Sequence, residues 1–487
     1  MPPGLDSLTN LDMLTMFVAG DETCNQRDIG KLRDLIALVN LRDELTIKFN
    51  DNFSCDVAEY EEVELIRLAP LKHLTIEFSD QGAAIHETLL TGLQPHCRLL
   101  AISIEEYRGL KLPLWTESLT ISLPHLVRIH LVNFNCLTIL PSLSQLRHLK
   151  SLMLEGISNV EFVESDGVVV PSENQLTFFP SLEELRLHEL PKLKGWWREE
   201  TNKVTGDAGA SSVVVPSFPC LRELVLRRCP HLTAFPSCPK LISVELFDVH
   251  EALTLAGSKT LVPNNPTTGL VLHLKKLVID NVGSLDCLFG ESLGGIQWLS
   301  IECFEGESLS NVAEKHARHI SSVEIMDLRN CSNLNSLSGV VNHLTSLQSL
   351  TIMDCKNLVL ENNEQVVNVM LWKSLHLLSS LTLNGLPTLS NLPKGFQYLT
   401  SLESLNIYHC ENLEALPEWL NCLTSLQNLS IHECYKVKLV PEAIAHMPSL
   451  KTLNLIRAGE ELKKRCRKPD GEDWPKICHI PHISFEY

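Results

Sequence analysis

Apolar residues recur in the C-terminal part of the chain at a fixed interval. Leu381, Leu405, Leu429 and Leu453 stand 24 residues apart, each as the first residue of a short L-x-L or L-x-I segment. Side chains in a strand alternate between its two faces, so both apolar residues of such a segment point one way and the residue between them points the other. The pattern therefore predicts one short strand in every 24-residue turn of the chain.

A fixed period of this length predicts a leucine-rich repeat, in which strands stack side by side and short connections lead to the next strand. Comparable segments begin at residues 14, 45, 74, 102, 129, 152, 185, 224, 244, 277, 299, 326, 350, 381, 405, 429 and 453. The predicted fold class is an α/β solenoid. We expect a leucine-rich-repeat horseshoe of about 17 turns, with a parallel concave β-sheet and short helical or irregular connections on the convex side.

The spacing of the segments differs between the two halves of the chain. Upstream of residue 320 the steps vary from 20 to 39 residues, whereas downstream they are 24 apart from one step of 31. We predict one repeat domain over residues 1–456 and a capping segment over residues 457–487. Because terminal repeats normally carry a polar cover and the chain starts inside a repeat, we also expect a further domain upstream. Insertions are expected at 156–176, 198–217, 256–269 and 361–368.

Two residue types recur in register with the predicted strands. Cysteine stands five residues after the strand position at Cys229, Cys331, Cys355, Cys410 and Cys434. The repeat consensus places Asn or Cys there, where the side chain turns inward and bonds the loop backbone, so we expect reduced thiols and a reducing compartment. We expect that compartment to be the cytoplasm, with the nucleus as an alternative.

Proline also recurs in register with the strands, at Pro393, Pro417 and Pro441. Because proline has no amide hydrogen to donate to a sheet, these positions are predicted to lie on the convex side.

Composition limits the classes of partner. The chain has 41 Lys and Arg against 59 Asp and Glu, and its net charge of −18 repels nucleic acid and anionic membranes. No apolar run approaches ~18 residues, so we expect no membrane span, and the first residues lack the pattern of a signal peptide. The basic run over residues 463–468 is either a nucleic-acid or targeting patch or the solvated face of a closing element.

Several short motifs resemble catalytic or ligand-binding signatures, but their spacing or their neighbouring residues do not fit those functions. GESLG at residues 290–294 matches G-x-S-x-G, but Leu293 within it is a repeat leucine. AGSKT at residues 256–260 lacks the G-K-[ST] of a phosphate loop, and HEC at residues 432–434 has no second histidine at metal-ligand spacing. We therefore expect no enzyme activity, no catalytic residue, no metal and no cofactor in this chain.

The residues that flank the inward leucines form the candidate binding surface. They point outward from the strands, and aromatic and arginine side chains among them are the usual anchors of protein interfaces. The predicted partner contacts on the concave face are Phe78, His130, Arg186, Arg227, Phe247, Arg329, Met353, Tyr408, His409, His432 and Arg457.

The repeats also resemble a known family. LTSLESLNIYHCENLEALPEWL at residues 399–420 and LTSLQNLSIHECYKVKLVPEAI at residues 423–444 resemble repeats of plant intracellular disease-resistance proteins of the coiled-coil nucleotide-binding leucine-rich-repeat (NLR) class. RCRKPDGEDWPKICHIPHI at residues 465–483 is similar to that family's closing R-C, G-x-D-W and H-I-P motifs. The resemblance covers the whole chain and is weaker across residues 156–270.

The resemblance implies a module that senses pathogen effectors or guarded host proteins and restrains a nucleotide-binding domain, its own or a partner's. In the family an ATP/ADP-binding domain precedes the repeats, and its phosphate loop and Met-His-Asp triad do not occur in this sequence. ATP or ADP is thus expected only in that absent domain. The alternative function is a free-standing intracellular adaptor, such as a substrate-recognition subunit of a ubiquitin ligase. An extracellular receptor ectodomain would instead carry a signal peptide and capping disulfides.

Overall fold

The computed structural model divides into two compact units, Met1–Leu272 and His273–Tyr487, and each is described by itself. Most of the predicted insertions, and the GESLG and AGSKT motifs, lie outside the described residues. The structure describes residues 5–19, 32–50, 65–80, 82–164, 179–197, 217–235, 237–250, 253–255, 274–288, 295–360 and 372–485.

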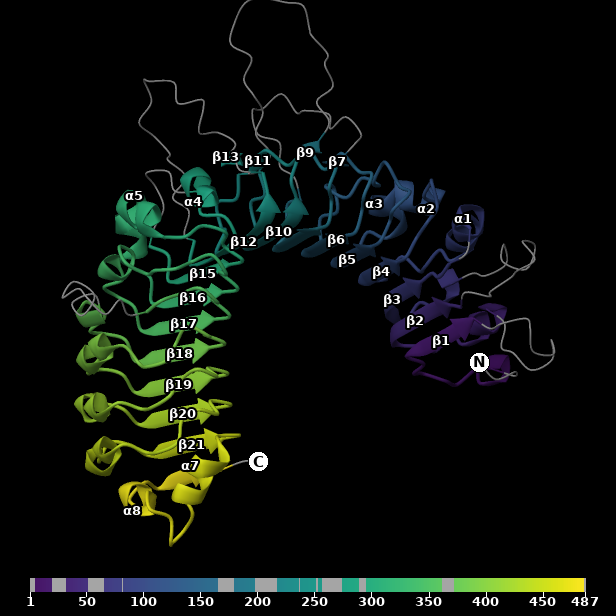
Figure 1. Cartoon of the computed structure of the whole chain (residues 1–487). Helices are drawn as coiled ribbons and strands as arrows, with labels where there is room; N and C mark the ends of the chain where they lie inside the picture. Colours follow the sequence, from purple (N-terminus) through teal and green to yellow (C-terminus); the bar gives the residue numbers. More distant parts are fainter. Residues whose placement is uncertain are drawn as a thin grey trace, which may run out of the picture. The chain divides into compact units, whose positions relative to one another are not determined.

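The first unit is built on a parallel sheet whose strands lie side by side in chain order (Figure 1). The strands of this sheet are β1 (Met16–Ala19), β2 (Asp43–Phe49), β3 (Leu71–Glu77), β4 (Ala101–Glu105), β5 (Arg128–Val132), β6 (Ser151–Glu155), β8 (Glu184–His188), β10 (Glu223–Cys229) and β12 (Ser243–Val249).

Short helices and two small strand pairs make the connections of this unit. The strand pairs are β7 (Phe162–Glu164) with β9 (Gly195–Trp197) and β11 (Ala234–Phe235) with β13 (Thr254–Leu255). The helices are η1 (Leu5–Ser7), η2 (Leu32–Ala37), η4 (Leu65–Arg67), α1 (Ala83–Gly92), α2 (Leu114–Glu117) and α3 (Leu119–Ser122).

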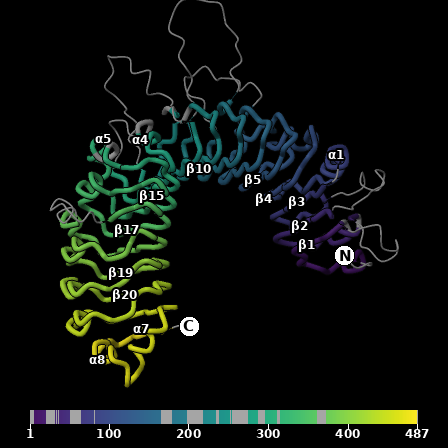
Figure 2. The backbone as a smooth tube through the Cα atoms, in the orientation of Figure 1, coloured from purple at the N-terminus to yellow at the C-terminus, as the bar shows by residue number. Residues whose placement is uncertain are grey.

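The second unit repeats the plan with greater regularity, and its successive turns stack as near copies in the backbone tube (Figure 2). Its strands are β14 (Lys276–Ile279), β15 (Trp298–Glu302), β16 (Ile325–Arg329), β17 (Ser349–Met353), β18 (Ser380–Asn384), β19 (Ser404–Tyr408), β20 (Asn428–His432), β21 (Thr452–Ile456) and β22 (His482–Ser484). Its helices are α4 (Gly283–Leu288), α5 (Ser310–Ile320), η5 (Val341–His343), η6 (Lys394–Tyr398), η7 (Glu418–Cys422), η8 (Glu442–His446), α7 (Glu460–Arg465) and α8 (Trp474–Ile477).

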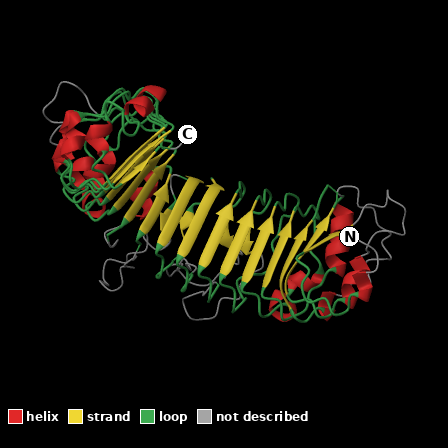
Figure 3. Cartoon of the chain, turned by 90° about the horizontal axis from the view of Figure 1, so that it is seen from below, coloured by secondary structure: helices red, strands yellow, loops and turns green. Residues whose placement is uncertain are grey.

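The predicted register is confirmed along most of the chain. Leu405 pairs with Leu381 on one side and with Leu429 on the other, and all three side chains are fully buried. Inward leucines of neighbouring turns therefore stack on one another, each worth roughly 1.5–3 kcal/mol when buried. Pro393 and Pro417 directly precede η6 and η7, on the connections that return the chain from one strand to the next. Figure 3 shows the strands running parallel to one another, with helices beside some of them and loops beside the others.

The first predicted strand position is wrong by one residue. Phe17 pairs with Ile47, and extending this register back places Thr15, not Leu14, opposite Leu45. Phe17 is fully buried whereas Leu14 is only half-buried, so the aromatic ring rather than the leucine determines the face that turns inward. The pattern also missed β22, where Ile483 pairs with Leu453 and extends the sheet beyond the last predicted strand.

The cysteine ladder faces inward as predicted. The Sγ atoms of Cys331, Cys355 and Cys434 lie 3.5–3.9 Å from carbonyl oxygens of the preceding strand. Together with Cys229 and Cys410 these thiols are free and fully buried. Burial raises the pKa of the Cys229 thiol to about 11. A small inward side chain that bonds backbone is thus shared by turns of both units.

None of the helices in the described part of the chain is both long and apolar enough to cross a lipid bilayer.

Candidate protein-interaction surface

Small polar side chains cover most of the outward sheet face between β17 and β21. They bond to one another across strands: the Asn406 side-chain amide donates to the Thr382 hydroxyl at 3.3 Å, and that of Asn454 donates to the Ser430 hydroxyl at 3.1 Å. The members are Ser349, Thr351, Ser380, Thr382, Ser404, Asn406, Asn428, Ser430, Thr452 and Asn454. These cross-strand bonds hold the Asn406 and Asn454 side chains in place on the sheet face.

The larger side chains lie at the end of each strand in this region. Met353, Tyr408 and His432 are half-buried and occupy the last residue of β17, β19 and β20. The rings of Tyr408 and His432 meet edge to face, with centroids 4.7 Å apart. Burial raises the pKa of the Tyr408 hydroxyl. Because each ring supports the other, they present an ordered aromatic surface beside the small polar ladder.

His409 and Arg457 do not lie on the strand face as predicted. They follow the strands directly and adopt a left-handed backbone with φ of 52° and 46°, as does Glu433 between them with φ 53°. A residue other than glycine holds this conformation at a cost of about 1–2 kcal/mol. The backbone amide of His409 donates to the His432 carbonyl at 2.9 Å, and that of Glu433 donates to the Ile456 carbonyl at 3.0 Å, which secures the turn.

Glu433 joins its two neighbours in this column into one charged group. Its carboxylate accepts from Arg457 Nη1 at 2.6 Å and lies 3.0 Å from His409 Nδ1. The hydrogen bond from Arg457 is the main cause that lowers the pKa of Glu433. Arg457 keeps 61% of its side chain exposed, so the group is anchored at its centre and open to solvent at its cationic end.

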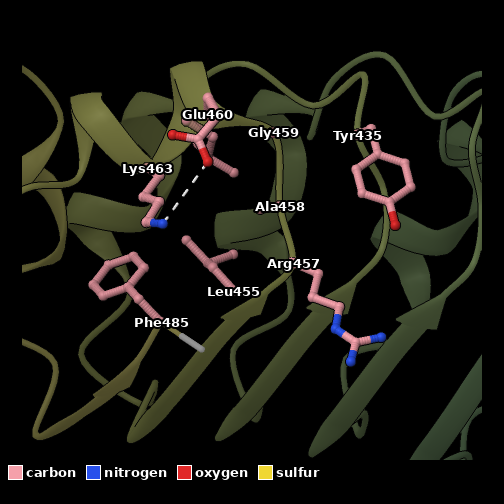
Figure 4. A pocket seen from close by; sticks show the side chains of 9 residues that line it. Tyr435, Leu455, Arg457, Ala458, Gly459, Glu460, Lys463 and Phe485 are labelled. Carbon is pink, nitrogen blue, oxygen red and sulfur yellow. Dashed lines mark ion pairs between the residues drawn. The ribbon is translucent and has the colours of Figure 1, made fainter. Parts of the chain in front are cut away.

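A pocket of about 400 Å³ opens beside Arg457 at the end of the second unit. Figure 4 shows Lys463 and Phe485 on one side, Tyr435 and Arg457 on the other, and Leu455 between them. The pocket is lined by Tyr435, Leu455, Arg457, Ala458, Gly459, Glu460, Leu462, Lys463 and Phe485. Sequence reasoning missed it because its walls come from the last repeat and from the segment predicted only as a cap.

A second cluster lies on the outward face of β15 and β16. The Trp298 indole donates to Asp327 Oδ2 at 3.0 Å, and the Lys276 ammonium stands 4.8 Å from the Trp298 ring centroid. Asp327 is 5% exposed and is 3.6 Å from Arg329 Nη2, which holds the guanidinium of this predicted contact in place. Arg329 Nε is buried and finds no acceptor among the described residues. Trp298 and Asp327 were not predicted, although both occupy outward positions that the strand alternation marks.

In the first unit the predicted contacts Arg186, Arg227 and Phe247 lie on neighbouring strands and carry a charge or a half-buried ring. Arg186 Nη2 pairs with Glu223 at 2.7 Å. Arg227 Nη2 pairs with Glu245 at 3.0 Å, and its guanidinium carbon lies 4.4 Å from the Phe247 ring centroid. The charged groups are paired with one another across the sheet, so the charges of a partner would compete with these internal ion pairs.

His130 is half-buried on β5, with Nδ1 at 3.2 Å from the Ser103 hydroxyl.

Phe78 is not part of the surface. Only 4% of it is exposed, and its ring stacks on Phe49 at 5.4 Å and on His86 at 4.5 Å. Burial lowers the pKa of His86 to about 4, so this ring is neutral in the stack near neutral pH. The prediction failed because the residue beyond the strand turns inward here, where an aromatic ring fills the space under the turn.

Sequence comparison agrees with this architecture. Residues 32–157 match the family model for R13L1/DRL21 LRRs. The repeats are similar to those of plant disease-resistance proteins. Disease resistance protein RGA2 of Solanum bulbocastanum is 31% identical over 171 residues, and putative disease resistance proteins RGA1 and RGA4 of the same plant are 29% and 30% identical over 167 and 172 residues.

Each of these matches covers 34% of the chain and spans only 16 or 17% of the relative's own length. Among solved structures, a leucine-rich-repeat protein of Leptospira interrogans aligns over 100% of this chain and 92% of that one, at 17% identity and a TM-score of 0.40. The leucine-rich-repeat fold is shown instead by the parallel strands of this chain and by their register from turn to turn. The resemblance to the repeat region of plant disease-resistance proteins is confirmed.

Proposed function

We propose that the chain is the protein-recognition and regulatory leucine-rich-repeat module of a plant immune receptor. It senses a pathogen effector or a guarded host protein in the cytoplasm. It restrains a nucleotide-binding switch domain, its own or a partner's, until that target is bound. The similarity to disease-resistance proteins of Solanum bulbocastanum supports this class of function. The proposal assigns no catalytic step to the chain and places ATP or ADP in the switch domain alone.

The observation that carries the proposal is the surface at the end of the second unit. Tyr408 and His432 form an ordered aromatic pair, and Arg457 stands exposed beside a pocket in the neighbouring turns. Tyrosine and arginine dominate the binding energy of protein interfaces, and a surface that is already ordered loses little entropy on binding. The flanking ladder of hydroxyl and amide side chains provides a flat polar rim.

The restraint is tested by supplying nucleotide-binding domains of related resistance proteins in trans and measuring association with the full chain. We expect saturable binding of at least one such domain. Tyr408→Ala should weaken binding of the recognised protein by about tenfold or more, because loss of an aromatic anchor removes over 1 kcal/mol. Asn384→Ala, at the corresponding position of β18, is the matched control and should leave binding unchanged. Absence of association across several domains contradicts the restraint.

A further inference from the structure

The pocket beside Arg457 exists because the last turn does not continue as a repeat. In the two preceding turns the position five residues after the strand leucine holds the buried Cys410 and Cys434, whereas here it holds Ala458, which is half-buried. The chain then turns into α7 and returns as β22. A Cβ atom at Gly459 would stand 2.7 Å from the Tyr435 carbonyl oxygen, so glycine permits the backbone to pass close over the previous turn. The space that the next repeat would fill remains open.

The chemistry of the pocket combines an apolar interior with a cationic rim. Leu455 and Leu462 are 3% and 1% exposed, and with the Phe485 ring they give the pocket its apolar lining. Arg457 and Lys463 stand on opposite sides, with 61% and 32% of their side chains exposed. Glu460 lies 3.8 Å from Lys463 with 79% of its side chain exposed, a loose surface pair that a bound anion can displace.

The local charge contrasts with that of the whole protein. Residues 457–487 contain seven Lys and Arg against six Asp and Glu, a balance of 7 − 6 = +1, whereas the whole chain carries −18. Within this segment Glu472 and Asp473 are paired with Arg465, and Arg457 is itself bonded to Glu433 of the preceding turn. An acidic segment is repelled by most of this molecule and finds its favourable charge environment here.

We propose that the pocket binds an extended acidic segment of a protein partner, which inserts one apolar side chain between Leu455 and Phe485 and places carboxylates against Arg457 and Lys463. A volume of about 400 Å³ is suited to one large side chain of such a segment. The inference rests on the proposed recognition function and names the chemistry of the segment that is recognised.

The experiment is a selection from a random peptide display library on the full chain, followed by affinity measurement of the strongest synthetic peptide. We expect selected peptides to share an aromatic or large aliphatic residue flanked by Asp or Glu. Lys463→Glu should weaken binding of the peptide by about tenfold or more, because it removes a cation and places a second acidic group beside Glu460 at the rim. Lys464→Glu makes the same charge change on the exposed neighbouring residue of α7, and should change affinity by less than about twofold because it does not line the pocket.

Three results would overturn the proposal: selected peptides without acidic residues, equal loss of affinity in both variants, or a single-stranded oligonucleotide that competes with the peptide. Hydrogen exchange over β21 and α7 verifies that each variant is folded. Failure here would leave the proposed function standing if Tyr408→Ala still weakens binding of the recognised protein, since Tyr408 lies outside the pocket.

Discussion

The space under the turn after a strand is filled by aromatic rings at two consecutive turns of the first unit and by thiols at several turns of the second. In the first unit, Tyr107 and Phe134 stand five residues after their strand positions, and their buried rings pack with centroids 5.1 Å apart. In the second unit the same position holds small buried thiols such as Cys410 and Cys434. The rings fill the space mainly by packing, whereas the thiols are small and bond backbone carbonyl oxygens. The thiol alone does not set the length of a turn, because the buried Cys229 holds the same position in the irregular first unit.

The outward sheet faces of the two units also differ in their chemistry. In the first unit, ion pairs such as Lys48–Glu77 and Arg186–Glu223, both 2.7 Å, join neighbouring strands. Between β17 and β21 of the second unit, hydroxyl and amide groups take that place. Exposed ion pairs contribute at most about 1 kcal/mol each, so neither face determines the fold. The difference lies in what a partner meets: paired charges on the first unit, and a neutral polar surface with aromatic anchors on β17 to β21 of the second.

The largest effect is expected from Leu405→Asp in the regular unit. Leu405 is fully buried between Leu381 and Leu429, and a carboxylate there would have no partner. We expect a loss of about 4 kcal/mol or more in the free energy of unfolding. Chemical denaturation with hydrogen exchange of the second unit measures it. Asn406→Asp places the same charge on the neighbouring outward residue and should cost less than about 1 kcal/mol; equal losses would contradict the assigned faces.

Sequence periodicity predicts the inward positions well because burial of leucine at every turn is a local requirement that repeats. It fails at Leu14, where a fully buried Phe17 determines the register, and at Phe78, where a ring fills the space under a turn. It also misses Asp327, which the strand alternation leaves outward but which Trp298 and its neighbours cover. These failures share a cause: the outcome depends on side-chain volume from adjacent turns, which a period does not contain.

The contributions of a ring and of a thiol to stability can be compared directly by replacing each with alanine. Phe134→Ala removes a fully buried ring and should cost about 3 kcal/mol or more in unfolding free energy. Cys410→Ala removes one small side chain and its weak bond to the Tyr408 carbonyl at 3.4 Å, and should cost about 1 kcal/mol. Unit-resolved hydrogen exchange distinguishes the two. A Cys410→Ala loss as large as that of Phe134→Ala would show that the thiol carries packing energy comparable to a ring.

The buried carboxyl groups of the two units should respond to acid in opposite directions. Glu164 is 1% exposed and accepts from the backbone amides of Leu143 at 2.7 Å and Ser144 at 2.5 Å, yet burial outweighs these bonds and raises its pKa. Burial also acts to raise the pKa of Asp473, but hydrogen bonds from Arg465, the Val440 amide and Lys476 outweigh it, and the pKa is lowered.

Stability from Glu164 is therefore fully present below its ordinary pKa of 4.5 and is lost as pH rises through the raised value. Stability from Asp473 is present above its ordinary pKa of 3.8 and is lost as pH falls through the lowered value. We expect Glu164→Gln to flatten the pH dependence of the first unit above about pH 4.5 while leaving the second unchanged. Asp473→Asn should reduce the acid limb of the second unit and leave that of the first unchanged. Unit-resolved hydrogen exchange, corrected for the intrinsic rate at each pH, measures both. A common pH response in the two units would show that neither carboxyl group dominates its own unit.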